Sequence, residues 1–509
     1  MEYLINKSLI LSFIYKILVF LYKKFTESAI YELFSRFFNK ITYYFSYSKI
    51  WTYLKGPDYF DRLWTNSLIY SICDKILNVP STLLRRFYLK HEKIFCHSYG
   101  FKFINWLVED FHSLLGLSLI LTFMIPDNRW YNVYGVLIAL GLFILFFIRT
   151  ILKPSNYIDI KNIDFTLILF MVVIGLSTIT SLFPRDSINQ FIYYMISFIT
   201  IIMIVGSTDN EDDLTKIIEL MIIGTFLTSL YGIYQWKVVG IAVNPSLTDV
   251  TVNQGMSGRV FSTMGNPNIY GEYLVLTLPF FGTVILNSKS WWKKMIYTVM
   301  LLPVILILLK TGSRSAWISF AFSLFVFVFY VNKKLLPFMF LAGLLAIPLL
   351  PQSIYRRLLT IFNPNDSSVQ YRKKILEPAI PMLRDYWLTG VGLGNQVFNT
   401  IYKRYKSFTL KTVAHTHNLY LQLWLEAGVF AIGSFLLLIF RLVKKSSNVI
   451  AKKENPTIAN ILIACISSIL GILVMGFADH IWFYNRILFL FFVIVALTFA
   501  ALKVANKEA

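Results

Sequence analysis

The sequence predicts an all-helical protein that crosses a membrane about a dozen times. Hydrophobic residues make up 56% of the chain and charged residues only 15%, whereas charged residues make up roughly 25% of a soluble domain. Apolar segments of about 20 residues, long enough to cross a hydrocarbon core of roughly 30 Å, recur from about Leu114 to the C-terminus. These segments must be helical, because lipid offers no partner to a free backbone N–H or C=O.

The apolar segments divide residues 111–509 into about twelve expected spans and their loops. The spans lie at about 112–125, 131–150, 164–183, 188–206, 214–236, 268–286, 295–310, 315–331, 335–350, 418–440, 457–477 and 484–503. Two loops are long, 237–267 and 351–417, and loops beyond about 15 residues are usually functional or disordered. The second long loop precedes the tenth span and is expected to be partly helical.

Lysine and arginine concentrate in alternate loops, and the side that carries them is expected to be cytoplasmic. These basic residues are Arg149, Lys153, Lys161, Lys289, Lys293, Lys294, Lys333, Lys334, Arg441, Lys444, Lys445, Lys452, Lys453, Lys503 and Lys507. An even number of crossings leaves both termini inside. The remaining loops, at about 126–130, 184–187, 237–267, 310–314, 351–417 and 478–486, are then extracytoplasmic.

Residues 1–110 form a separate region in which basic residues are interleaved with large apolar ones. This pattern is typical of short amphipathic helices in a membrane interface, where anionic cytoplasmic lipids hold them. The net charge is +21, but the interleaved apolar residues and the lack of a recognition motif argue against nucleic acid as a partner. The stretch Leu9–Leu21 is an alternative, tilted span.

The sequence indicates neither a disulfide framework nor a metal site. Cys73, Cys96 and Cys465 are scattered and lack CxxC spacing. The outer loops contain no Asp-x-Asp and no cluster of His and Asp, so we expect no metal and no other cofactor. No cleavable signal peptide is evident, because Lys16 interrupts the first apolar run.

The stretch 415–422 ends the long outer loop and begins an apolar helix. Because the unperturbed pKa of histidine lies near neutrality, an imidazole here can take a proton from a hydroxyl and pass it on. His417 is the expected base, and His415 is its rival. Asn418 and Gln422 are expected to support the base by hydrogen bonding. The alternative role for His417 is a local hydrogen bond at the start of the helix.

Several arginines lie in loops on the same expected side as His417, which points to a bound anion. Guanidinium groups pair with phosphate oxygens through two parallel hydrogen bonds and stay charged at physiological pH. Arg259 and Arg314 are the principal candidates. Arg372 is a further candidate, and a solvated charge on an amphipathic helix is its alternative role.

The last outer loop carries Asp479, His480 and Arg486. These residues either form an ion pair that closes the bundle or contact the substrate. Glu426 falls within an expected span, where a carboxylate is costly and needs a partner. A paired or protonated packing residue is the alternative to a functional Glu426.

Four motifs follow one another along the chain. They are Arg259-x-x-Ser262-Thr263-x-Gly265-Asn266-Pro267-Asn268, Thr311-Gly312-Ser313-Arg314-Ser315, Arg372 before Trp387-Leu388-Thr389-Gly390-Val391-Gly392-Leu393-Gly394-Asn395, and His417-Asn418 before Gly428. In this order they resemble the O-antigen ligase and polymerase superfamily over roughly residues 112–503. Three residues after Gly428 the ligases favour Gly, Thr or Tyr, whereas this chain has Ala431, which weakens the ligase subtype more than the superfamily.

The resemblance implies a glycosyltransferase of the cytoplasmic (inner) membrane. Such an enzyme moves a glycan from undecaprenyl diphosphate to a hydroxyl of a glycan, lipid or protein acceptor on the extracytoplasmic face. The transfer inverts the sugar carbon and uses neither nucleotide sugar nor metal. Arg259 and Arg314 match the family's two arginines and imply binding of the diphosphate. His417 matches the family's histidine and implies the general base.

Two other classes of function remain as alternatives. A transporter needs polar groups at mid-membrane and often broken helices, whereas the expected spans are apolar at their centres. A non-catalytic membrane scaffold requires His417 and Arg314 to be dispensable. Ligase and polymerase share the same site chemistry, so the sequence leaves both open.

Overall fold

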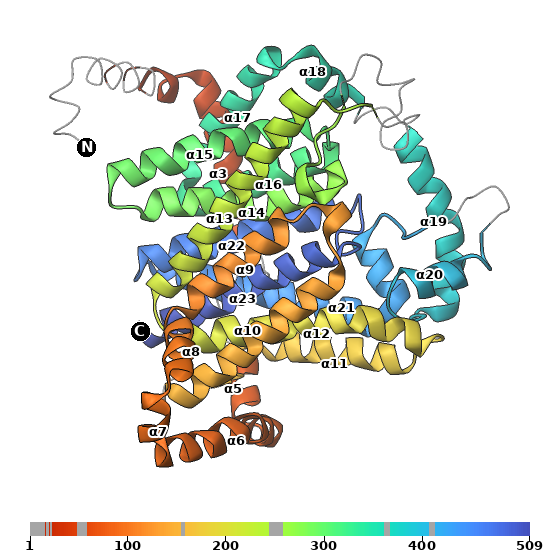
Figure 1. Cartoon of the computed structure of the whole chain (residues 1–509). Coiled ribbons are helices and arrows are strands. Elements are labelled where there is room, and N and C mark those ends of the chain that lie inside the picture. The colour runs from red at the N-terminus through yellow and green to blue at the C-terminus, as the bar shows by residue number, and fades with distance from the viewer. Residues whose placement is uncertain are drawn as a thin grey trace.

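The chain folds into a bundle of helices with further helices along its outside (Figure 1). The computed structural model describes residues 16, 20, 23–47, 59–153, 158–243, 258–360, 367–406 and 413–508. Every regular element in this part of the chain is helical. The expected all-helical class is therefore confirmed.

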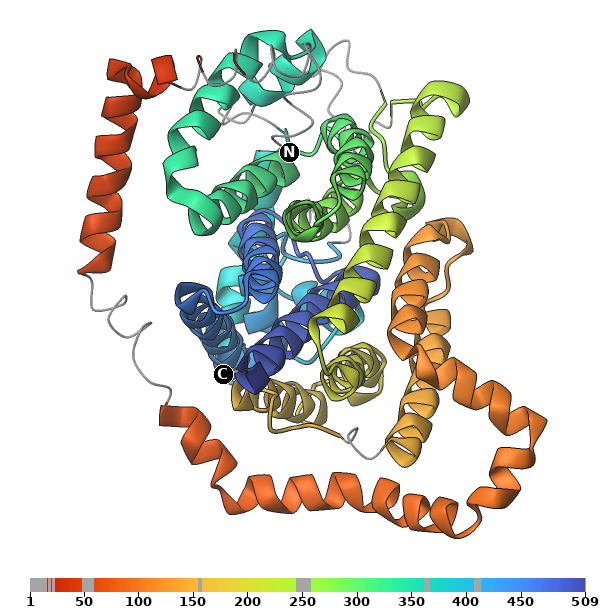
Figure 2. The same ribbon diagram turned by 90° about the vertical axis from the view of Figure 1, so that its left-hand side faces the viewer.

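The bundle is built from helices that begin after residue 110. They are α9 (Phe111–Met124), α10 (Asn132–Leu152), α11 (Phe165–Ile179), α12 (Pro184–Ser207), α13 (Glu211–Tyr234), α14 (Pro267–Asn287), α15 (Trp291–Lys310), α16 (Arg314–Asn332), α17 (Leu336–Ala346), α21 (Leu419–Lys452), α22 (Pro456–Met475) and α23 (Asn485–Glu508). The apolar stretch of α23 has a mean hydropathy of 2.7 and is 94% buried. Figure 2 shows the blue C-terminal helices in the middle of the molecule.

Local signals in the sequence explain where the bundle helices begin. The side chain of Asn418 accepts a hydrogen bond from the N–H of Leu421 at the start of α21. Asn455 caps α22 in the same way through the N–H of Ile458. α12, α14 and α22 each have a proline in their first turn, where the missing N–H costs no hydrogen bond.

Within the described residues, nine helices are long and apolar enough to cross a membrane. α9 has 14 residues and reaches span length only together with α8, across a bend of 76°. α11 has 15 residues, and α17 has 11 and belongs to one apolar stretch with α16, Arg314–Ala346. The count of about twelve spans is therefore not confirmed, whereas the repeated apolar helices support a multi-pass membrane protein.

The shortness of α11 has a structural cause. The expected span ran to residue 183, but the helix ends at Ile179. Beyond it, the N–H of Leu182 donates to the carbonyl of Val391 at 3.1 Å. After the helix ends, the backbone pairs with the long outer loop. An apolar sequence pattern does not reveal this pairing.

The two sets of loops that the charge pattern separates lie at opposite ends of the described bundle. At one end, Lys503 of α23 donates to the carbonyl of Val205 at the end of α12, and Asn287 donates to Thr457. The outer-loop helices α18 (Gln352–Leu359), α19 (Ser367–Tyr386) and α20 (Asn395–Tyr402) belong to the other set. In Figure 1, α19 and α20 lie at the right of the bundle and the C-terminus at its left.

Helices of residues 1–110 lie along the outside of the bundle (Figure 2). They are α3 (Ala29–Ser46), α5 (Tyr59–Thr65), α6 (Leu68–Lys90), α7 (Glu92–His97) and α8 (Tyr99–Glu109). Ser81 is the single buried residue of α6, and Asn78 of this helix bonds both the N–H and the carbonyl of Ile158. Most of Leu9–Leu21, the alternative span, lies outside the described residues.

The long outer loop docks into a break in α21. Gly428 has φ 78° and ψ 179°, which interrupts the helix. The N–H groups of Val391 and Gly392 donate to the carbonyls of Leu425 and Glu426 at 2.8 and 2.9 Å. A Cβ at Gly428 would lie 2.1 Å from the carbonyl oxygen of Leu388. The glycines of this motif therefore allow two backbones to meet. Residues 244–257, 361–366 and 407–412 of the long loops lie outside the described part.

Candidate functional site

His417 lies where the long outer loop meets α21, and the surrounding backbone holds it in place. Its φ is 51°, in the left-handed region that is uncommon for residues with a side chain. The N–H of His417 donates to Nδ1 of His415 at 3.2 Å. The N–H of Thr416 donates to Oε1 of Gln422 at 2.8 Å. Gln422 and the helix cap Asn418 therefore position the loop that carries the two histidines.

Asp479, from the loop between α22 and α23, joins the histidines. Its Oδ1 lies 3.0 Å from Nδ1 of His417 and 4.0 Å from Nδ1 of His415. The N–H of His480 donates to the same oxygen at 2.9 Å. The side chain of His417 is 28% exposed, against 10% for His415 and 11% for Asp479. His417 is thus the most accessible member of this histidine cluster, which we define as His415, His417 and Asp479.

Burial and charge set the ionisation of the groups around His417. Burial opposes the ionised form of Asp479, but the hydrogen bond from His417 and the charges of His417, His415 and Arg372 together hold its pKa well below the usual range. Burial lowers the pKa of His415 to about 4, against the attraction of Asp479. Burial likewise lowers the pKa of His480 well below its ordinary value. At pH 7 the site therefore contains a carboxylate and neutral His415 and His480.

The histidine cluster also has the geometry of a metal site. One ligand atom from each of His415, His417 and Asp479 lies within 4.8 Å of the others. The expectation that the outer loops lack a cluster of His and Asp is therefore wrong. Asp479 is 62 positions from His417 in sequence, and only the packing of α21 beside α22 brings them together. Two nitrogen ligands suit a transition metal better than Mg²⁺, and the charge of Arg372 nearby opposes any cation.

Arg259 is held against the chain that precedes α16. Its Nε donates to the carbonyl of Thr311 at 2.7 Å, and its Nη2 donates to Oδ1 of Asn268 at 2.5 Å. The N–H of Val260 donates to the carbonyl of Lys310 at 3.0 Å. These contacts bring together the first two motifs of the sequence, which lie in different loops.

Two more arginines lie beside the segment that precedes α16. Arg314, the first residue of α16, donates through Nη1 to the carbonyl and the hydroxyl of Thr360, both at 2.9 Å. Arg357 of α18 donates through Nε to the carbonyl of Gly312 at 3.3 Å. We call Arg259, Arg314 and Arg357 the arginine cluster. The sequence analysis missed Arg357, because α18 carries no motif that distinguishes it from Arg356 beside it.

The members of the arginine cluster repel one another. Burial, followed by the charges of Arg357 and Arg314, lowers the pKa of Arg259 to about 9. With a pKa of about 9, the guanidinium group of Arg259 is still protonated at pH 7. A bound anion would relieve this repulsion, and the N-terminus of α16 adds a positive helix dipole next to Arg314.

Helix α14 connects the two clusters. Asn268, which binds Arg259, and Glu272 are one helical turn apart and so lie on the same face of α14. Glu272 is buried on this face, and its carboxyl interacts electrostatically with Asp479. A Cβ at Gly271 would lie 2.7 Å from a side chain of α16. The arginine and histidine clusters therefore flank the first turns of one helix.

Of the other expected site residues, one lies near the histidine cluster and one makes contacts between parts of the helical bundle. Arg372 of α19 faces the histidine cluster, since its charge acts on both His415 and Asp479. Arg486 instead pairs with Asp127, with 2.8 Å between Nη2 and Oδ1, and donates to the carbonyl of Ile125 at 3.0 Å. Of its two expected roles, the geometry therefore matches an ion pair that closes the bundle.

Glu426 supports the loop rather than facing outward. It is 4% exposed, and its Oε1 accepts a hydrogen bond from Nε2 of Gln422 at 2.8 Å. Its backbone carbonyl accepts from Ser177 at 2.9 Å. A chain of contacts thus runs from the break in α21 through Gln422 to the backbone that holds His417.

Comparison with known proteins identifies the domain that carries much of this site. Residues 273–436 match the family described as O-Antigen ligase. Over 223 residues the chain is 28% identical to the ComP-specific O-oligosaccharyltransferase of Acinetobacter baylyi, which covers 42% of this chain. The chain spans 38% of the length of that relative. Residues 273–436 therefore resemble an O-antigen ligase domain, and the expected resemblance of the chain to the O-antigen ligase superfamily is confirmed.

Proposed function

We propose that the chain is a membrane glycosyltransferase that moves a glycan from undecaprenyl diphosphate to an acceptor hydroxyl. The observation that carries this proposal is the hydrogen bond between His417 and Asp479, at 3.0 Å, on a face of the bundle shared with the arginine cluster. A base and an anion site are the two elements that transfer from a diphosphate requires. The O-antigen ligase domain supports the same class of reaction.

The arginine cluster binds the diphosphate of the donor. Negative charge grows on the diphosphate as its bond to the sugar breaks, and fixed guanidinium groups stabilise that charge without reorganisation. Arg259 and Arg314 supply forks matched to phosphate oxygens, and Arg357 adds a third charge. Arg372 lies by the histidines, where it contacts the acceptor side of the donor or the acceptor itself. No metal is required, because the arginines take its role.

His417 removes the proton of the acceptor hydroxyl. The carboxylate of Asp479 accepts the Nδ1–H of His417, which leaves Nε2 as the atom that receives the proton. The acceptor oxygen forms a bond to the anomeric carbon while the bond from that carbon to the diphosphate oxygen breaks. Attack from the face opposite the leaving group inverts the carbon. His415 is neutral and largely buried, so it acts as a support for His417 rather than as the base.

The site lies on the extracytoplasmic face of the cytoplasmic (inner) membrane in this proposal. About twelve crossings, with α9, α11 and α17 as short spans, leave both termini inside and the two clusters outside. Residues 1–110 lie in the cytoplasmic interface and contact membrane lipids. The acceptor is a glycan, a lipid or a protein, and either ligation or polymerisation uses the same residues.

The test is transfer by the full chain in proteoliposomes that contain an undecaprenyl-diphosphate-linked oligosaccharide and a hydroxyl acceptor. Arg314→Lys keeps the charge but loses the fork, so we expect donor affinity to fall about tenfold to a hundredfold. Arg404→Lys, which changes an exposed arginine of the long outer loop, is the control and should leave affinity unchanged. Equal donor affinity in both variants would contradict the proposed role of the arginine cluster.

A further inference from the structure

A polar pocket opens at the end of the bundle opposite the two clusters. It has a volume of about 340 Å³ and lies between α5, the start of α11 and the ends of α21 and α23. Its wall includes four lysines, Lys161, Lys445, Lys452 and Lys503. No aspartate or glutamate lines it in the described part of the chain. A cavity with this lining attracts anions.

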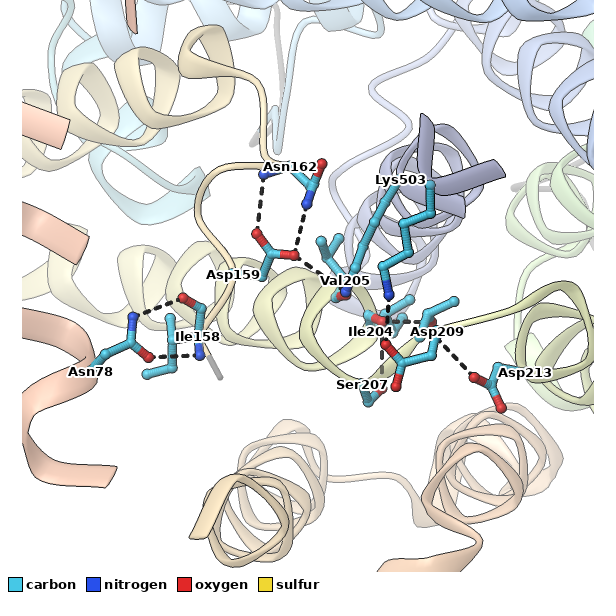
Figure 3. A network of polar contacts seen from close by, with 12 residues as sticks. Asn78, Ile158, Asp159, Asn162, Ile204, Val205, Ser207, Asp209, Asp213 and Lys503 are labelled. Atoms are coloured by element: carbon cyan, nitrogen blue, oxygen red, sulfur yellow. Dashed lines mark hydrogen bonds and ion pairs between the residues drawn. The ribbon is translucent and has the colours of Figure 1, made fainter. Parts of the chain in front are cut away.

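Two of these lysines are partly neutralised by buried carboxylates behind the wall. Nζ of Lys445 lies 2.6 Å from Oδ2 of Asp164, which also pairs with Arg441 at 2.9 Å. Nζ of Lys503 lies 3.2 Å from Oδ2 of Asp159. Figure 3 shows the side chain of Lys503, near the end of α23, extending towards Asp159 in the loop before α11. Asp164 is thus shared between Lys445 and Arg441.

The other two lysines are exposed and carry their full charge into the pocket. Lys161 and Lys452 are exposed, and no carboxylate pairs with either of them among the described residues. Lys161 lies in the loop before α11 and Lys452 is the last residue of α21, and both line the same cavity. Two exposed lysines at one cavity, without a carboxylate partner among the described residues, match a phosphate group placed between them.

Trp64 of α5 adds an unsatisfied donor to the same wall. Its Nε1 is buried and has no hydrogen-bond partner in the described structure. A buried N–H without an acceptor is destabilising. A turn of the indole ring towards the pocket would let an oxygen of a bound phosphate accept from this N–H. Tryptophan is also common where headgroups meet the apolar core.

We propose that this pocket binds the phosphate of an anionic phospholipid. Lys445 and Lys452 lie near the end of α21 and Lys503 near the end of α23, which are both of membrane length, where the headgroups of the cytoplasmic leaflet are expected. Ile163, Val449, Phe499 and Leu502 line the pocket beside the lysines and offer the apolar surface that acyl chains require. This site lies apart from both clusters and does not depend on the proposed transfer reaction.

A second pocket at the same end provides an internal control. It has a similar volume, about 370 Å³, and contains Lys289 and Lys293. It is also lined by Glu211, Asp212 and Glu219, so carboxylates outnumber lysines. An anionic headgroup should avoid this pocket although its size would fit.

The experiment measures retention of phosphatidylglycerol or phosphatidylcholine by the full chain in detergent, with native mass spectrometry. We expect phosphatidylglycerol to bind and phosphatidylcholine to bind much more weakly. Lys161→Gln combined with Lys452→Gln should weaken phosphatidylglycerol binding about thirtyfold, or about 2 kcal/mol at about 1 kcal/mol per basic residue. Trp64→Phe keeps an aromatic ring but removes the N–H donor, so we expect a loss of about fivefold. Lys289→Gln combined with Lys293→Gln should change nothing.

Inorganic phosphate distinguishes a lipid from a free anion. We expect millimolar phosphate to leave the bound lipid in place, because phosphate lacks the apolar contacts. Displacement of the lipid by phosphate at similar concentration would overturn the lipid assignment. Unchanged phosphatidylglycerol binding in both the lysine double variant and Trp64→Phe, with the thermal unfolding temperatures of the wild type, would overturn the site itself.

Discussion

Asp479→Asn tests whether the carboxylate of Asp479 orients His417 as the base. The substitution keeps the shape of the side chain but replaces one carboxylate oxygen with an NH₂ group and removes the charge. In the wild type this carboxylate accepts from His417 at 3.0 Å and is 11% exposed. An asparagine there can donate to Nδ1 of His417, which moves the imidazole proton to Nε2. The base would then present a proton to the acceptor hydroxyl instead of a lone pair.

The size of the effect follows from the hydrogen bond that is lost. A hydrogen bond to a charged group contributes about 1.5–3 kcal/mol, which corresponds to about tenfold to 150-fold in rate. We expect kcat to fall by at least about tenfold and the wrong tautomer to increase the loss. Donor affinity should stay within about threefold, because Asp479 does not belong to the arginine cluster.

The assay is transfer in proteoliposomes at saturating donor, with donor binding measured separately by titration. Asp385→Asn is the control, since Asp385 lies in α19 of the long outer loop and accepts a hydrogen bond from the hydroxyl of Tyr405. It should retain wild-type kcat. A wild-type kcat for Asp479→Asn, or a loss confined to donor affinity, would refute the role of Asp479 as the partner of the base.

Three further predictions follow from the two clusters. Arg357→Gln should weaken donor binding about tenfold, measured by titration, whereas Arg356→Gln at the exposed neighbouring position should not. Treatment with EDTA or 1,10-phenanthroline should leave the transfer rate unchanged, and a loss restored by one added metal would assign the histidine cluster to that metal instead. The folded pKa of His415 is about 4, below its usual value of 6.5, so the free energy of unfolding should fall by up to about 3 kcal/mol from pH 6.5 to 4. This contribution to the free energy of unfolding should not change above pH 6.5. His415→Asn should make the thermal unfolding temperature depend less steeply on pH.

Apolar periodicity and charge were enough to predict the helical class and which loops share an end of the bundle. Both depend on the composition of contiguous segments. The exceptions are places where a distant segment ends a helix. α11 stops at Ile179 because Leu182 pairs with Val391, and α21 breaks at Gly428 because the long loop docks there. Sequence hydropathy contains no information about either partner.

In the candidate site too, residues within contiguous motifs could be predicted, whereas contacts between distant segments could not. His417, Arg259 and Arg314 are recognisable from motifs, and the structure brings the two arginines to one segment. Arg357 was missed because its role depends on where α18 docks. The pairing of Asp479 with His417 could not be deduced, since it arises from the packing of helix ends far apart in sequence. The sequence left two roles open for Arg486, an ion pair that closes the bundle or a contact with the substrate. Its contact with Asp127 matches the ion pair.

The most direct test of the central claim compares His417→Ala with His415→Ala in reconstituted, single-turnover transfer, with donor binding titrated for each. We predict that His417→Ala abolishes transfer while donor affinity stays within about threefold, because the arginine cluster is intact. His415→Ala should retain measurable transfer, since this residue supports the base without accepting the proton. Near wild-type turnover in His417→Ala together with loss in His415→Ala would identify His415 as the base, and full activity in both variants would contradict the general-base mechanism.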